Sequence, residues 1–218
     1  MIHPNYLCTC SLMLLIMGCK APCPTIGELS APEHAVYVTD SDFPVQFAIP
    51  DSVTPHYDGC TECSGGKGIH WYGSNELCWN AGPSFGLNIQ FNDTMTARTC
   101  KAWTRMESQA YCDPSTLDIW RKYDCMDETI DECLSGNSWY RLSHFSYHIP
   151  SSGLGSGFWN GYSVDIFKDG LVVSGTLSYH CSEHVDLNAK EPWILSWLRS
   201  IRVLSNEEWK EALKNPRK

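Results

Sequence analysis

Apolar and polar side chains alternate most clearly between residues 162 and 179. Asp169-Gly170 is the preferred pair for a two-residue type I′ hairpin turn, and it sets Lys168 opposite Leu171. Counting outward from the turn places three apolar pairs on one face: Ile166 with Val173, Val164 with Gly175, and Tyr162 with Leu177. Two polar pairs share the other face: Asp165 with Ser174, and Ser163 with Thr176. The pattern predicts an antiparallel sheet with one buried and one wetted face.

The same period of two predicts further strands. Residues 35–39 and 45–49 read as the first two, with Val45, Phe47 and Ile49 on one face, and Pro50 ends the second because proline cannot donate to a ladder. Residues 87–91 alternate as a half-buried strand, with Leu87, Ile89 and Phe91 on its apolar side.

Two helices are predicted after the hairpin. Apolar residues recur at helical spacing after Pro192, which predicts an amphipathic helix that packs on the sheet: Trp193, Ile194, Trp197, Leu198 and Ile201. Ser205 and Glu208 have the spacing of a capping box, so a terminal helix begins there, with Leu204 and Trp209 as its hydrophobic staple.

The middle of the chain lacks a clear period. Residues 51–84 are rich in Gly, Cys, His and Trp and predict a long loop. Helices are predicted from Asp113 through Trp120 and over residues 127–134, the second ended by Gly136, with Cys112, Cys125 and Cys133 stapling them to the loops. The predicted fold class is α+β: an antiparallel sheet with helices packed on one face and disulfide-rich central loops.

The amino-terminal segment indicates export. Residues 7–17 have the length of a signal-peptide apolar region, so residues 1–18 read as a signal peptide, 19–33 as a tether and 34–218 as a single α+β domain. The run from Leu15 to Cys19 resembles a bacterial lipobox, in which Cys19 carries the lipid. The alternatives are an ordinary secretory signal that leaves Cys19 as a plain thiol, and a buried amino-terminal helix. Any membrane contact would run through that lipid anchor.

Twelve cysteines are too many for a reducing cytosol unless metals hold them. Ten remain after the leader and allow five disulfides; if Cys19 is lipidated, nine remain and one is left unpaired. The disulfide candidates other than Cys19 are Cys23, Cys60, Cys63, Cys78, Cys100, Cys112, Cys125, Cys133 and Cys181. The expected compartment is extracytoplasmic: periplasm, cell envelope or secreted space.

Charge narrows the choice of partner. The net charge is −9, which repels phosphate backbones and argues against nucleic-acid binding, while it is compatible with a basic protein partner or cations. Another protein is therefore the expected partner. The nine tryptophans and ten tyrosines serve either core packing or contacts with a sugar or protein ligand.

Three clusters have metal-ligand chemistry. Cys60, Cys63 and Cys78 with His70 have the ligand types of a zinc site, although in an oxidising compartment these cysteines favour disulfides. His180, Glu183 and His184 could converge on one ion if the chain turns after Tyr179; in a continuing strand the two histidines stand roughly 13 Å apart. An acidic run reads as a calcium site or, preferably, a solvated helix face: Asp124, Asp127, Glu128, Asp131 and Glu132.

The segment 43–50 resembles the opening strand of PsbP-like and DcrB-like exported domains, and residues 193–203 after the hairpin are similar to their closing helix and strand. The resemblance implies a non-catalytic binding or assembly module, often lipid-anchored. The expected function is therefore an exported, disulfide-stabilised, non-catalytic binding or inhibitory protein of the immunity type, without a cofactor. The alternative is a metal-dependent extracytoplasmic enzyme centred on His180, Glu183 and His184, with zinc as the metal to expect.

Overall fold

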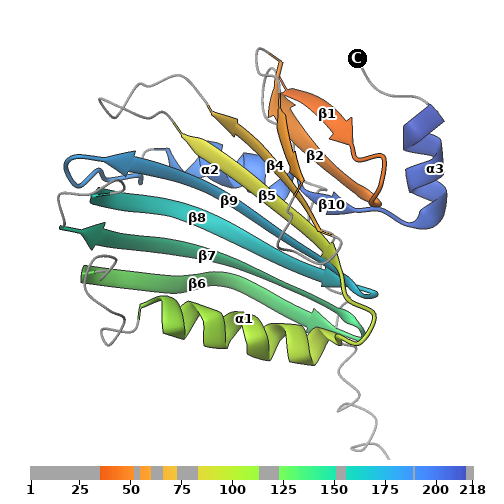
Figure 1. Cartoon of the computed structure of the whole chain (residues 1–218), viewed down its shortest axis with the longest axis horizontal. Coiled ribbons are helices and arrows are strands. Elements are labelled where there is room, and N and C mark those ends of the chain that lie inside the picture. Colours follow the sequence, from red (N-terminus) through yellow and green to blue (C-terminus); the bar gives the residue numbers. More distant parts are fainter. Residues whose placement is uncertain are drawn as a thin grey trace, which may run out of the picture.

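The computed structural model describes residues 35–51, 55–59, 66–72, 83–112, 123–150, 156–188 and 190–214. These ranges form two antiparallel sheets and three helices (Figure 1). The larger sheet has seven strands, in the spatial order β3 (His56–Gly59), β4 (Lys67–Tyr72), β5 (Ser84–Phe91), β9 (Leu171–Cys181), β8 (Gly157–Lys168), β7 (Ser138–Ile149) and β6 (Tyr123–Ser135). The smaller sheet has β1 (Ala35–Thr39), β2 (Val45–Pro50) and β10 (Arg202–Val203). The helices are α1 (Ala97–Tyr111), α2 (Glu191–Arg199) and α3 (Asn206–Lys214).

The predicted α+β class with an antiparallel sheet is confirmed, and so is the central hairpin. Strands β8 and β9 pair in the predicted register, from Lys168 opposite Leu171 out to Tyr162 opposite Leu177. Asp169 and Gly170 have φ angles of 49° and 88°, the left-handed conformation that a type I′ turn requires at both positions. The hairpin forms the centre of the large sheet, and β5 and β7 add to its two sides.

One face of the large sheet forms the main hydrophobic core. Helix α2 and strand β2 cover this face, and their apolar residues pack with Val164, Val173 and Leu177 of the hairpin. A Cβ on Gly175 would lie 2.4 Å from Ile201 Cδ1, so glycine allows the chain after α2 to approach the sheet closely. As predicted, Ile194 and Leu198 of α2 are fully buried.

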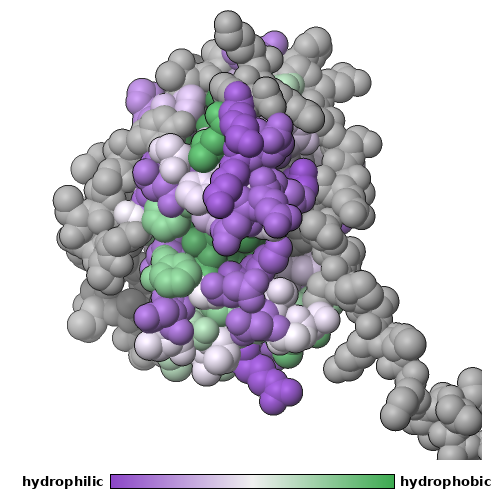
Figure 2. All heavy atoms as spheres, turned by 90° about the vertical axis from the view of Figure 1, so that its right-hand side faces the viewer, coloured by the Kyte–Doolittle hydropathy of each residue, from purple (hydrophilic) through white to green (hydrophobic). Residues whose placement is uncertain are grey.

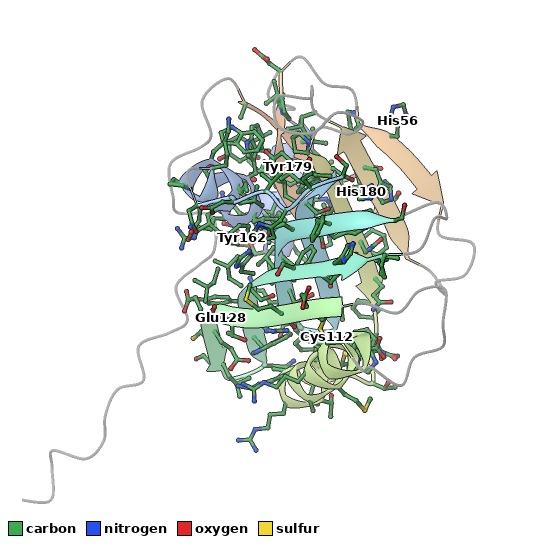
Figure 3. All side chains as sticks on the ribbon, turned by 90° about the vertical axis from the view of Figure 1, so that its left-hand side faces the viewer. His56, Cys112, Glu128, Tyr162, Tyr179 and His180 are labelled. Atoms are coloured by element: carbon green, nitrogen blue, oxygen red, sulfur yellow. A yellow bond between two sulfur atoms is a disulfide. The ribbon has the colours of Figure 1, made fainter. Side chains whose placement is uncertain are left out.

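Helix α1 packs on the opposite face. A second cluster joins Ala97 and Cys100 of α1 to Trp139, Phe167 and Val172, which alternate along their strands with residues of the main core. The helices thus lie on both faces of the sheet, whereas they were predicted on one. The face that was predicted to be wetted carries apolar residues at one end, and α1 packs on them. In Figure 3, α1 lies at the lower right and α2 at the left, on opposite sides of the sheet.

The predicted helix over residues 127–134 is wrong: this segment lies in β6, an edge strand that pairs with β7. Gly136, predicted as a helix stop, has a φ of 58° and turns the chain from β6 into β7. The acidic spacing resembles a helix face, but pairing along the whole of β7 outweighs local propensity.

Helix α1 was not predicted. Thr96 caps it, because its Oγ1 accepts a hydrogen bond from the Thr99 backbone N at 3.2 Å, and the buried positions Ala97 and Cys100 are too small to mark an apolar stripe. The predicted loop over residues 51–84 contains β3 and β4. Where described, it is ordered by strand pairing, since β3 pairs with β4 and β4 pairs with β5. The predicted helix over residues 113–120 lies outside the described residues.

The predicted capping box is confirmed. The Ser205 backbone N donates to Glu208 Oε2 at 2.8 Å, and the Glu208 backbone N donates to Ser205 Oγ at 3.2 Å. Trp209 Nε1 donates to the Asp40 carbonyl, which ties α3 to the chain after β1. Figure 2 shows this side of the molecule, where hydrophilic side chains form a band. Within the described ranges, no helix is long and apolar enough to cross a membrane.

The cysteine framework is formed in part. Cys112 and Cys125 form a disulfide between the end of α1 and β6. Cys133 and Cys181 each take part in a further disulfide. Cys100, predicted as a disulfide candidate, is instead a buried free thiol, because it faces the sheet within the α1 cluster. The other disulfide candidates lie outside the described residues: Cys23, Cys60, Cys63 and Cys78. The predicted signal peptide (residues 1–18), the tether (residues 19–33) and the lipidation residue Cys19 also lie outside them.

Candidate functional site: a cleft between helix α1 and the sheet

A cleft of about 300 Å³ opens between the carboxyl-terminal half of α1 and the large sheet. Charged, hydroxyl and aromatic side chains from α1 and strands β6 to β9 line it: Thr104, Glu107, Ser108, Cys112, Met126, Asp127, Arg141, Ser143, Phe145, Tyr147, Ser163, Asp165 and Thr176. In Figure 3, Cys112 marks the end of α1 on this side of the sheet.

The strand period puts these polar residues on one face. Arg141 pairs in register with Asp165, and Asp165 pairs with Ser174, so one polar residue from each of three neighbouring strands stands in a row. Ser143, Ser163 and Thr176 form the next row. Near the amino terminus of α1 the same face is apolar and packed, so the cleft begins where the apolar residues end.

Among the described residues that line the cleft, Arg141 is the only cation, and it is 6% exposed. Its Nη2 donates to Asp127 Oδ1 at 2.8 Å, and its Nε donates to Thr129 Oγ1 at 2.9 Å. A buried guanidinium must be paired to offset its lost hydration. Asp127 and Thr129 of the edge strand therefore fix Arg141 on the floor of the cleft.

Asp165 lies beside this pair with fewer partners. Burial raises the pKa of Asp165 and the Asp127 charge adds to the rise, while the hydrogen bond from Ser174 and the Arg141 charge oppose it. The Ser174 hydroxyl donates to Asp165 Oδ1 at 2.7 Å. A carboxyl group with a raised pKa in a cleft is a candidate for binding or proton chemistry.

Aromatic rings form the wall of the cleft at its far end. Phe145 and Tyr147 stack with centroids 6.2 Å apart. The stack continues across the strands from Tyr147 to Trp159 at 6.0 Å and from Trp159 to His180 at 4.3 Å. These cross-strand contacts hold the rings in place, so the wall is a rigid apolar surface beside the polar floor.

Helix α1 is held over the sheet by Glu132. Its Oε2 accepts hydrogen bonds from Lys101 Nζ at 2.7 Å and Arg105 Nη2 at 2.8 Å, and its Oε1 accepts one from Trp139 Nε1 at 3.1 Å. Burial opposes ionisation, but these donors outweigh it and lower the pKa of Glu132. This ion-pair cluster holds the middle of α1, and the disulfide at Cys112 holds its carboxyl-terminal end.

The structure does not bring the predicted metal residues together. Strand β9 continues through Cys181, so the turn after Tyr179 that a shared ion required is not made. His180 stacks on Trp159 and its Nε2 lies 2.8 Å from the Ser156 carbonyl oxygen, whereas His184 contacts the edge of Phe158, whose side chain points to the other face. Within the described residues, no group of three or more His, Cys, Asp or Glu side chains could hold a metal.

The predicted acidic patch has structural roles in β6. Asp127, Asp131 and Glu132 bond to Arg141, to the Tyr140 hydroxyl and to the α1 cluster, respectively. Burial and the hydrogen bond to Asp131 raise the pKa of Tyr140 to about 12. Of the predicted zinc ligands, His70 lies in β4, and the three cysteines lie outside the described residues.

Sequence reasoning did not find the cleft. The polar pairs that involve Asp165, Ser163 and Thr176 were placed on one face correctly, but that face was expected to be wetted. The cleft depends on α1, which the sequence pattern did not predict. A helix above a charged strand face turns exposed polar positions into the floor of a cleft.

Comparison with known proteins identifies the fold. No family model matches the chain, and no curated protein sequence is similar to it. A solved structure that does match is the solution structure of cyanobacterial PsbP (CyanoP) from Synechocystis sp. PCC 6803, with 12% identity and a TM-score of 0.51 over 81% of this chain and 95% of that chain. The resemblance to PsbP-like domains predicted from the sequence is confirmed as a likeness of fold.

Proposed function

We propose that this chain is a non-catalytic binding protein of the extracytoplasmic space, and that the cleft between α1 and the sheet is its ligand site. The observation that carries the proposal is Asp165, a partly buried carboxyl group in the cleft whose one described side-chain donor is Ser174. Fold stability alone does not favour a charge there, since burial disfavours its ionised form. A ligand that contacts the carboxylate would offset this cost.

An inhibitory role of the immunity type is the finer form of this proposal. The net charge of −9 suits a basic protein partner, since opposite charges steer two proteins together and raise the association rate. A basic toxin or enzyme would be the partner to expect. The likeness of fold to PsbP is compatible with a binding module.

Cysteine parity supports lipidation of Cys19. Of the ten cysteines that follow the predicted leader, Cys100 is a free thiol, which leaves nine. Nine cannot all form disulfides within one chain, so a second must be unpaired or modified. A lipid on Cys19 leaves eight, an even number, and would place the protein at a membrane surface outside the cytoplasm.

The amino terminus of the mature protein tests the location. Mass spectrometry of the native protein should find a chain that begins at Cys19 and carries a lipid mass. A soluble chain that begins with Met1 would contradict export, and a chain cleaved near Gly18 with an unmodified Cys19 would support export but contradict the lipid anchor.

A ligand screen tests the cleft itself. The folded, oxidised protein would be screened by NMR against small cationic, anionic and neutral compounds, with backbone amide shifts as the measurement. We expect the largest shifts at Ser143, Ser163 and Thr176. Shifts that gather on α3 or the small sheet, with none at the cleft, would overturn the proposed site.

A further inference from the structure

The balance of charge in the cleft indicates the class of its ligand. Among the described residues that line the cleft, three are carboxylates, those of Glu107, Asp127 and Asp165, against the single guanidinium of Arg141. Arg141 already donates to Asp127 and Thr129, so that pair is largely neutralised. Asp165, together with the exposed Glu107, then leaves an excess of negative charge among the described lining residues. Around the partly buried Asp165, Coulomb attraction is stronger than at an open surface.

The hydrogen-bond roles of the floor agree with this charge. Within the described residues, Ser174 is the one side chain that donates to Asp165, and it reaches Oδ1 only. Ser143 and Ser163 bond to each other at 2.8 Å on the row beside it. A donor group on a ligand would therefore find the second carboxylate oxygen of Asp165 without displacing a protein partner.

The shape of the cleft limits the size of the ligand. A volume of about 300 Å³ lies at the small end of ligand sites. The aromatic wall of Phe145 and Tyr147 offers contact to an apolar stem, and an aromatic face also attracts a cation. The space suits one side chain or one small amine rather than a large cofactor.

We propose that the cleft binds an organic cation, an alkylammonium or guanidinium group on an apolar stem, with Asp165 as its counter-ion and the aromatic wall against the stem. This inference rests on the proposed binding function of the cleft and names the ligand class. A lysine or arginine side chain of a basic protein and a free amine share this chemistry.

Three probes with one stem length test the role of charge: pentylammonium, pentanol and pentanoate. Each is titrated into the folded, oxidised protein and followed by the amide shifts of Ser163 and Thr176. We expect pentylammonium to bind most tightly, and Asp165→Asn to weaken it by about tenfold or more, as loss of a charged hydrogen-bond partner does. Glu211→Gln removes the same charge from exposed α3 and should leave the affinity unchanged.

Two results would overturn the assignment. Binding of pentanol or pentanoate at least as tight as that of pentylammonium would show that the site does not select a cation, as would unchanged pentylammonium affinity in Asp165→Asn. The cleft would then remain a ligand site of another class. If no probe shifts the cleft and the wider screen above also finds no ligand there, both the cation assignment and the proposed binding site fail.

A further arm separates the two sources of the cation. A lysine tripeptide with blocked ends presents the same ammonium group on a peptide. Tighter binding of the peptide than of pentylammonium supports a protein partner, and tighter binding of the free amine supports a small amine; either supports the cation assignment.

Discussion

The two faces of the large sheet are built from alternate residues of the same strands, yet they differ in chemistry. On the α2 face, Val164, Val173 and Leu177 are fully buried in an apolar core. On the α1 face, their neighbours Asp165 and Ser163 line a cleft. The first face is what a stable domain requires, since burial of apolar surface drives folding. The second keeps charges under a helix, and the proposed binding site therefore lies on this face.

The largest expected effect is on the core face. Leu177→Ala should lower the free energy of unfolding by about 4 kcal/mol, because Leu177 is fully buried and the change leaves a cavity. Thr176→Ala, the adjacent residue on the cleft face, should change it by about 0.5 kcal/mol or less. Urea unfolding of both variants checks the contrast, and equal losses would show that the faces contribute alike.

Breaking the charged floor of the cleft should come next. Arg141→Met leaves Asp127 and Asp165 without their buried counter-ion, and we expect a loss of about 3 kcal/mol. Asp127→Asn with Arg141→Met should recover part of this loss, since the uncompensated charges are reduced. Thermal unfolding measures both variants; an Arg141→Met protein as stable as the wild type would contradict the pairing.

Loss of the disulfide beside the cleft should have a somewhat smaller effect. Cys112→Ser with Cys125→Ser opens a short loop and should lower stability by about 2.9 kcal/mol in the chain-entropy picture. Hydrogen exchange should rise at the carboxyl-terminal half of α1 and in β6 before it rises in the hairpin of β8 and β9. A uniform rise across the sheet would show that the disulfide does not act locally.

Acid should loosen α1 selectively. The pKa of Glu132 is held below its ordinary value of 4.5 by its donors, so its ion pairs stabilise the fold above that value and are lost as the pH falls through the lowered pKa. We expect α1 amides to lose protection below about pH 4, while β9 amides keep theirs. The variant Glu132→Gln should show reduced α1 protection at pH 7 and little further change with acid.

Much of the core face was predictable, because local patterns there agree with the fold. The turn at Asp169-Gly170 set the register of the hairpin, and the spacing of Ile194 and Leu198 placed α2 on the sheet. The cleft face was not predictable in the same way. The acids of residues 127–134 suit either a helix or an edge strand, and α1 buries only small residues such as Ala97, so tertiary pairing decided both.

Under the proposed function, Asp165 serves ligand binding at the expense of stability. Burial raises its pKa, against the Arg141 charge of β7 and the Ser174 hydrogen bond of β9, while Asp127 of β6 adds to the rise. The raised pKa means that the ionised carboxyl destabilises the fold at pH values above it, and that this penalty disappears as the pH falls through it. On α1, burial and the Asp165 charge raise the pKa of the Cys100 thiol to about 11. The thiol therefore stays neutral at every pH at which Asp165 is tested.

The stability of Asp165→Asn as a function of pH is therefore the most direct measurement. Urea unfolding at pH 8 should show the variant about 1 kcal/mol more stable than the wild type, as expected when a functional charge is removed. The difference should shrink as the pH is lowered, because the wild-type carboxyl becomes protonated. A variant that is less stable than the wild type at pH 8, or a difference that does not change with pH, would show that Asp165 supports the fold and would contradict the account of the cleft.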